Sequence, residues 1–172
     1  MNGFFLKNLP DRGCLEEMAE RYPEMNPDAA EVYLHFLRLG ADVGNRISDY
    51  LAGHKLSTGR MSVMMMLNSC PNESKTPGEL AERCGVTAAT ISRLVDGLIK
   101  DGHVQRVPDP ENRRVSPIRM TDAGRKHLEQ LLPGYFKDVA RMFGPLSANE
   151  RNNFLKLLNK LQSNLNEESE LS

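Results

Sequence analysis

Two side chains that could recognise a base pair, Thr90 and Arg93, stand three residues apart. If the segment from residue 88 to residue 100 is a helix, both project from the same side. A guanidinium can donate two parallel hydrogen bonds to O6 and N7 of guanine, and threonine offers a hydroxyl and a methyl group. Ala88 and Ala89 are small, which lets the helix backbone approach its target closely. This combination indicates a surface that reads base edges in the major groove of DNA.

A first helix and a tight turn would hold this surface in place. Thr76 and Glu79 have the spacing of a capping box, and Pro77 suits the first helical position. Gly85 can adopt the positive φ that ends such a helix, and we expect Val86 to fill the corner of the turn. These signals predict a short helix between Thr76 and Gly85. Thr76, at its start, is also a DNA-binding candidate.

The second helix of this unit follows at once. Thr87 is its expected N-cap, and Asp101-Gly102 ends it. The predicted buried face consists of apolar residues spaced three and four apart, which are Ile91, Leu94, Val95 and Leu98. Ser92 lies at the margin of the outer face. The DNA-binding residues predicted on this helix are Thr87, Ala88, Ala89, Thr90, Ser92 and Arg93.

Two short strands are predicted after this helix. Residues 103–107 alternate between apolar and polar types, residues 108–112 are rich in turn formers, and residues 115–120 give the returning strand. A narrow minor groove concentrates negative potential and attracts an inserted guanidinium. A solvent-exposed hairpin with two arginines is the alternative, but the position directly after a recognition helix favours DNA. The loop residues expected at the groove are Asn112, Arg113 and Arg114.

The chain before this unit is expected to form an extension and a long helix. Residues 1–25 are weakly patterned, with one short helix capped by Asp11. Asn26, followed by proline, is a strong start signal for a helix that ends near Gly53. Its apolar seam recurs every three or four residues, at Tyr33, Leu37, Gly40, Gly44, Ile47 and Leu51.

A group of methionines marks the next helix, which is expected to run from Ser57 to the break at Cys70-Pro71-Asn72. Methionines at helical spacing are usually core residues, but their adaptable side chains also suit a ligand crevice. We hypothesise a pocket for a small aromatic or lipophilic effector. Its lining would be Tyr33, His35, Phe36, Met61, Met64 and Met65.

The chain after the strands is expected to be helical. Thr121 caps a helix that Pro133-Gly134 interrupts, by a kink or by a break. Ser147 and Glu150 form a second capping box, and the last helix carries apolar residues close to a 3.5-residue period, namely Phe154, Leu157, Leu158, Leu161 and Leu165. The tail from residue 166 to residue 172 is acidic and expected to fray.

The terminal helices, at about 27–53 and 122–165, have apolar faces that a chain of this size could cover only partly. Packing against a second copy would bury them and give a two-fold homodimer. The alternative is that these helices simply cover each other.

Composition limits the class of protein. The 172 residues are 40% apolar and 26% charged, which is ordinary for a globular domain. No apolar run approaches the ~20 residues needed to cross a bilayer, and the first residues lack the pattern of a signal peptide. The three cysteines are widely spaced and odd in number, which indicates a reducing interior. We therefore expect a cytoplasmic protein with no membrane partner.

Charge is unevenly distributed along the chain. The net charge is −1, but residues 75–126 carry ten Lys/Arg and seven Asp/Glu, a net of +3, and the remainder carries −4. The basic excess coincides with the expected DNA-binding unit. Because the excess is small, useful affinity for DNA requires two copies acting together.

An enzyme is not indicated. The sequence has no glycine-rich phosphate loop, no His-Glu-x-x-His and no nucleophile elbow. The four histidines lack the spacing of metal ligands, so we expect neither a metal nor another cofactor. Cys14 lies in the N-terminal extension, Cys84 is expected to be buried and Cys70 precedes a proline, which disfavours redox sensing by any of the three. The alternative to a DNA-binding regulator is a winged-helix module that binds protein and no specific DNA.

From about Pro27 to Leu165 these residues resemble the MarR family of bacterial transcription regulators. The resemblance is carried by Glu79-Leu80-Ala81, Gly85-Val86-Thr87, Ser92-Arg93-Leu94-Val95-Asp96, Asp101-Gly102, and the wing Asn112-Arg113-Arg114 with Thr121 and Gly124 beyond it. It implies a mainly α fold with a small β-wing. A winged helix-turn-helix lobe at about 57–124 would be joined to dimerisation helices at about 27–53 and 122–165.

The resemblance also implies a function and residue roles. Members of the family are dimers that bind a palindromic operator in double-stranded DNA and usually repress a nearby gene, and many release it when a phenolic or lipophilic ligand binds. By matching positions, Ala89, Thr90 and Arg93 would read bases, Arg114 would enter the minor groove and Arg113 would support it. Asn112 stands where the family has aspartate, so this side chain can only hydrogen-bond.

Overall fold

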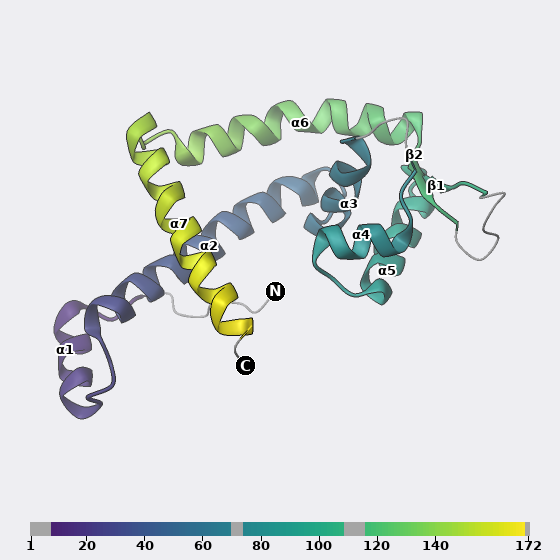
Figure 1. Ribbon diagram of the computed structural model, residues 1–172. Helices are drawn as coiled ribbons and strands as arrows, with labels where there is room; N and C mark the ends of the chain where they lie inside the picture. Colours follow the sequence, from purple (N-terminus) through teal and green to yellow (C-terminus); the bar gives the residue numbers. More distant parts are fainter. Residues whose placement is uncertain (1–7, 70–73, 109–115, 171–172) are drawn as a thin grey trace. The chain divides into compact units, whose positions relative to one another are not determined.

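The computed structural model describes residues 8–69, 74–108 and 116–170, with side chains to residue 167. It is mainly helical with one small antiparallel sheet, as the sequence predicted (Figure 1). The elements in chain order are α1 (Arg12–Arg21), α2 (Pro27–Gly53), α3 (Thr58–Asn68), α4 (Pro77–Cys84), α5 (Ala88–Lys100), β1 (Val104–Arg106), β2 (Ile118–Met120), α6 (Asp122–Phe143) and α7 (Ala148–Glu170). The chain divides into two compact units, residues 1–129 and residues 130–172.

Side-chain caps set the start of the first two helices. The Asp11 carboxylate accepts a hydrogen bond from the Cys14 N–H at 2.9 Å, and the Asn26 side chain accepts one from the Ala29 N–H at 3.0 Å. Such caps satisfy backbone donors that have no partner inside the helix. Both helices therefore begin where the sequence predicted.

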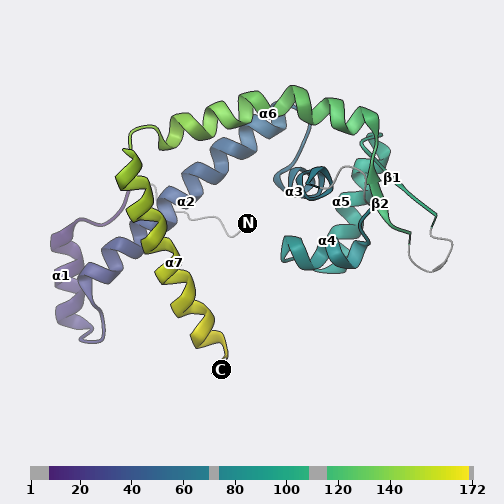
Figure 2. The ribbon, with the colours of Figure 1, turned by 45° about the horizontal axis from the view of Figure 1, so that its top comes forward.

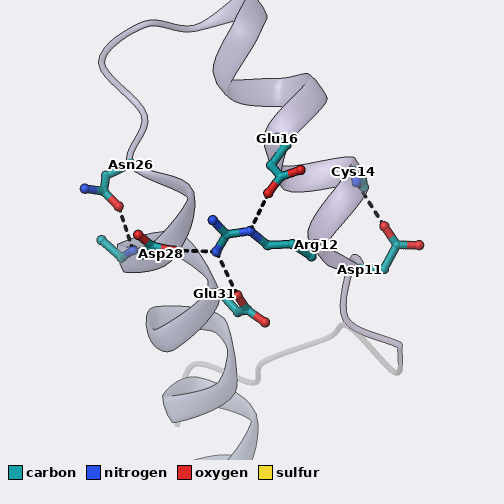
Figure 3. Close-up of polar contacts among 8 residues, drawn as sticks. Asp11, Arg12, Cys14, Glu16, Asn26, Asp28 and Glu31 are labelled. Atoms are coloured by element: carbon teal, nitrogen blue, oxygen red, sulfur yellow. Dashed lines mark hydrogen bonds and ion pairs between the residues drawn. The ribbon is translucent and has the colours of Figure 1, made fainter.

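Helix α1 is attached to the first turns of α2 (Figures 1 and 2). Its only buried residue is Leu15. Arg12 forms an ion pair with Glu16 of its own helix at 2.8 Å, and it also pairs with Asp28 and with Glu31 of α2 (Figure 3). These hydrogen-bonded carboxylates raise the pKa of the Arg12 guanidinium. The network is exposed to solvent, so it contributes specificity of docking more than stability.

The core of the first unit lies where α3, α4, α5 and the sheet meet. Helix α3 begins at Thr58, one residue after the predicted start, because Ser57 is its N-cap and accepts from the Arg60 N–H at 3.3 Å. The buried apolar residues of these elements are Met61, Val63, Met64, Leu67, Leu80, Ile91, Val95, Leu98, Val104, Ile118 and Met120. Complete burial of one valine, leucine, isoleucine or methionine side chain stabilises a fold by ~1.5–3 kcal/mol.

The sheet is shorter than predicted. Val104 lies opposite Met120 and Arg106 lies opposite Ile118, whereas the sequence predicted strands over residues 103–107 and 115–120. Pro117 explains part of the difference, because it has no N–H to donate to a ladder and only its carbonyl is used, by the Val107 N–H at 2.8 Å.

Lys75 forms an isolated antiparallel bridge with Ile118, on the side of β2 that does not face β1. Its N–H donates to the Ile118 carbonyl at 2.9 Å, and the Ile118 N–H donates back to the Lys75 carbonyl at 2.7 Å. Lys75 is 5% exposed. Because Lys75 directly precedes the start of α4, this bridge ties the helix-turn-helix to the wing.

Helix α6 continues through Pro133 as one helix from Asp122 to Phe143. Of the two predicted alternatives, a break at Pro133-Gly134 is therefore wrong. A proline removes one backbone hydrogen bond, and the turns on either side of it carry the helix on. Gly144, where a Cβ would lie 3.0 Å from the Ala140 carbonyl oxygen, follows the last residue of α6.

Helix α7 begins with the predicted capping box. The Ser147 N–H donates to the Glu150 carboxylate at 2.7 Å, and the Glu150 N–H donates to the Ser147 hydroxyl at 3.3 Å. The helix runs to Glu170, so the fraying predicted from residue 166 is not seen in the described part of the tail. No described helix combines the length and the apolar character needed to cross a membrane.

Candidate nucleic-acid interface

The capping box at the start of α4 is formed as predicted. The Glu79 N–H donates to the Thr76 hydroxyl at 3.2 Å, and the Glu79 carboxylate accepts from the Thr76 N–H at 2.6 Å and from its hydroxyl at 2.8 Å. The Thr76 N–H and then its hydroxyl lower the pKa of the Glu79 carboxyl. Glu79 therefore stays ionised at the positive end of the helix dipole, and the Thr76 hydroxyl is already committed inside the chain.

The turn between α4 and α5 depends on Gly85. This residue has φ 62° and ψ 36°, the left-handed conformation that favours glycine. The next N–H, from Val86, donates to the Ala81 carbonyl at 3.1 Å. The Val86 side chain is 39% exposed, so the prediction that it fills the corner is wrong. The backbone closes this turn, and Leu80 and Ile91 are the fully buried apolar residues beside it.

Helix α5 presents most of the predicted outer face to solvent, but Thr90 is half-buried. Thr87 caps it, with its hydroxyl accepting from the Thr90 N–H at 3.2 Å. The hydroxyls of Thr87 and Thr90 also hydrogen-bond to each other, with their oxygens 3.0 Å apart, which fixes the orientation of the Thr90 side chain. Of the predicted inner face, Ile91, Val95 and Leu98 are buried, and Leu94 is half-buried.

The exposed residues of the first turns are Ala88, Ala89, Ser92 and Arg93. Among the described residues Arg93 has no ion-pair partner, so its guanidinium is available to a ligand. The small residues leave the helix backbone open on the same surface. This arrangement can approach a groove and donate hydrogen bonds there.

The remaining predicted DNA contacts differ in what the structure says of them. Thr76 lies at the far end of α4 from Thr87, about 12 Å along a helix of eight residues. Asn112, Arg113 and Arg114 lie outside the described residues. The structure therefore gathers the predicted contacts of α5 on one surface and leaves the wing contacts as predictions.

An ion pair that the sequence did not reveal links α5 to the wing. The Arg106 guanidinium of β1 donates to the Asp96 carboxylate at 3.1 Å. The two residues are not at helical spacing from each other, so no local pattern predicts the pair.

The wing is also fastened to the start of α6. The Thr121 hydroxyl donates to the Gly102 carbonyl, with the oxygens 2.7 Å apart, and accepts from the Gly124 N–H at 3.0 Å. A Cβ on Gly124 would lie 2.1 Å from the His103 carbonyl oxygen. The Thr-x-x-Gly pattern at these positions therefore has a steric reason.

Two histidines stack beside this junction. The ring centroids of His103 and His127 are 4.6 Å apart and the planes differ by 19°. Within the described residues, His103 Nδ1 and His127 Nε2 are buried and lack a hydrogen-bond partner. Burial, followed by the neighbouring His103 and His54, lowers the pKa of His127. The two histidines are far apart in the sequence, so no local pattern predicts the stack.

The residues of the hypothesised effector pocket fall into two groups. Met61 and Met64 are buried in the core, at 5% and 0% exposure, whereas Tyr33 and Phe36 are exposed, at 59% and 48%. His35 is exposed too, and Met65 is half-buried. Both ribbon views place α3 at the C-terminal end of α2 (Figures 1 and 2), and Tyr33 is ~30 Å along the helix from that end. One chain does not bring the two groups together, so the pocket stays a prediction.

The cysteines differ in their surroundings. Cys14 is exposed and Cys84 is partly buried, while Cys70 lies outside the described residues. Burial raises the pKa of the Cys84 thiol. A raised pKa reduces the thiolate fraction and with it the reactivity of this side chain.

Comparison with known proteins agrees with this geometry. The MarR family model matches residues 55–115. The chain is 35% identical over 156 residues to the HTH-type transcriptional repressor YetL of Bacillus subtilis, covering 91% of this chain and 93% of that protein.

Solved structures show the same fold. The crystal structure of a MarR family transcriptional regulator from Silicibacter pomeroyi has a TM-score of 0.60 at 29% identity, covering 77% of this chain and 88% of that one. An E. coli MarR mutant complexed with operator DNA has a TM-score of 0.67 at 21% identity, covering 84% and 96%. At this lower identity the likeness is one of fold.

Fold and site together define a winged helix-turn-helix transcriptional regulator. The chain belongs to the MarR family.

Proposed function

We propose that this regulator binds a palindromic operator in double-stranded DNA as a homodimer and represses transcription in the cytoplasm. The observation that carries the proposal is the exposed outer face of α5. Arg93 forms no ion pair with another described residue, and the exposed Ala88 and Ala89 precede it on the same helix. A capped helix N-terminus adds exposed N–H donors that favour phosphates. The name of the B. subtilis relative, a transcriptional repressor, supports repression.

Exposed apolar residues on three helices support a homodimer. Large apolar side chains left in solvent at helical spacing indicate a surface that a partner covers, and a second copy is the economical partner. Those on α2 are Val32, Tyr33, Phe36 and Leu39, and those on α6 and α7 are Phe136, Leu155, Leu157, Leu161 and Leu165.

Charge gives a second reason for a dimer. Residues 75–126 carry a net of only +3 per chain, so one copy neutralises few phosphates and binds DNA weakly. Two copies double that charge and place two recognition helices on one face of the duplex. The half-sites should then lie about one helical turn apart, ~10 base pairs.

An effector would act on the same assembly. We propose that a small aromatic or lipophilic molecule binds near Tyr33, His35 and Phe36 of α2, where apolar and aromatic side chains are exposed. Met65, half-buried on α3, would join such a site only from another copy or after a rearrangement. Screening aromatic acids and lipophilic phenols by thermal shift tests this proposal, and a flat screen would count against it.

The test of the main proposal is to select fragments of the source genome on the purified protein and to footprint those retained. We expect the footprint to show paired half-sites, and sedimentation of the complex to show one protein dimer bound to each pair. Retention of no fragment above a scrambled control would instead favour the alternative, a winged-helix module that binds protein. A bound monomer on a single half-site would overturn the dimer.

A further inference from the structure

Arg60 of α3 reaches the last turn of the recognition helix. Its Nη1 atom donates to the Asp101 carboxylate at 2.7 Å, and the two side chains are 30% and 38% exposed. Asp101 is the C-cap of α5, with its own N–H bonded to the Gly97 carbonyl. The ion pair therefore joins α3, part of the core, to the end of the helix that carries Arg93.

Gly97 is where the Arg60 guanidinium lies against α5. A Cβ at position 97 would stand 2.1 Å from Nη2, 2.7 Å from Cζ and 2.9 Å from Nε of Arg60. Three atoms of one guanidinium thus occupy the space that any other side chain would need. Glycine inside a helix is less stable than alanine, so this contact accounts for a residue that helix propensity disfavours.

The contact at Gly97 and the ion pair at Asp101 are separate observations on one guanidinium. Together they hold the Arg60 guanidinium at two positions on α5, against Gly97 and beside Asp101. The Asp96–Arg106 pair holds the same helix from the wing side. Helix α5 is consequently held from two sides by charged groups in its C-terminal half, while its N-terminal half presents Arg93.

We propose that Arg60, seated on Gly97, is a positioning residue that sets the placement of α5 and thereby the sequence discrimination of DNA binding. It acts through the helix. This inference rests on the proposed operator binding. Base readout depends on a guanidinium meeting O6 and N7 in a fixed geometry, so a small movement of α5 reduces recognition of the operator more than attraction to phosphates.

Two variants remove the contact in different ways. Arg60→Met keeps an unbranched apolar stem and loses the guanidinium with its charge. Gly97→Ala displaces the guanidinium while favouring the helix, so it separates positioning from loss of stability. Arg12→Met is the control, since it removes an arginine with three carboxylate partners at the α1–α2 junction.

The measurement is the ratio of dissociation constants for operator and for unrelated DNA, with the salt dependence of each. We expect both test variants to lower this discrimination on the order of tenfold, with affinity for unrelated DNA and the salt slope unchanged. Gly97→Ala should do so at an equal or higher melting temperature. Arg12→Met should leave the ratio unchanged.

Three results would overturn the inference. Discrimination at the wild-type level in both variants would show that the contact is dispensable. An equal loss on both DNAs with a smaller salt slope would make Arg60 a phosphate contact. A ratio of one for the wild-type protein itself would remove the proposed function and this role with it, and so is distinct from the first result.

Discussion

His103, at the entrance to β1, and His127, on α6, are stacked ring on ring with their centroids 4.6 Å apart. Burial, followed by the neighbouring His103, lowers the pKa of His127. The junction between the wing and α6 therefore favours a neutral imidazole at His127.

Stability should consequently fall in mild acid. The pKa of His127 is lowered in the folded chain from an ordinary value of 6.5, so below that pH the unfolded chain binds more protons than the folded one. By linkage the free energy of unfolding then decreases with falling pH, and it levels off below the folded pKa. Above pH 6.5 this contribution is fully present.

Thermal unfolding between pH 5 and pH 8 checks this expectation. His127→Phe keeps an aromatic ring against His103 and removes the titrating group. Its melting temperature should depend less on pH over this window than that of the wild type. Tyr22→Phe, at the exposed C-cap of α1, is the control. Identical pH profiles for His127→Phe and the wild type would show that the stack does not titrate.

Arg93→Ala should weaken operator binding by about 1–3 kcal/mol and relax selectivity at one base position. The physical reason is the loss of a bidentate hydrogen-bonding fork, which no other exposed residue of the first turns of α5 can replace. Binding to an operator series with single-base changes measures both effects. Arg21→Ala, which removes one exposed arginine from α1, is the matched control, and an equal loss in the two variants would reduce Arg93 to a general charge effect.

Gly124→Ala should destabilise the first unit by about 1–3 kcal/mol, as overpacking does elsewhere. The added methyl group would meet the backbone carbonyl of His103 at 2.1 Å, and a backbone atom cannot swing aside. Urea unfolding gives the free energy. Gly53→Ala, where a Cβ would meet nothing within 4 Å, should be neutral or slightly stabilising, so similar losses in both would contradict the steric argument.

Met64→Ala should cost about 2–5 kcal/mol of stability, because Met64 is fully buried and truncation leaves a cavity. Met65→Ala, at a half-buried site on the same helix, should cost clearly less. Chemical denaturation of the two variants separates a core methionine from one with access to solvent. A neutral Met64→Ala would mean that this side chain lines an adaptable space.

Local signals in the sequence predicted the helices well. Asn26, Ser57, Thr76, Thr87 and Ser147 each cap a helix within a residue of its expected start. Caps and glycine turns are decided by hydrogen bonds between near neighbours, so residue types at short spacing are enough to find them.

Contacts between distant segments escaped the sequence analysis. Arg60 and Asp101 are 41 residues apart, and the His103–His127 stack joins a strand entrance to a helix. Such pairs depend on how helices pack, which no local pattern encodes. The misplaced Val86 has the same origin, since burial of the corner was decided by Leu80 and Ile91 on two helices.

The bridge between Lys75 and Ile118 has a consequence for how this protein meets other chains. A short sheet normally leaves backbone donors and acceptors along its outer strand, where a foreign strand can add. Ile118 pairs with Arg106 on one side and with Lys75 on the other. Strand addition and aggregation along β2 are therefore blocked at this residue by the protein's own chain.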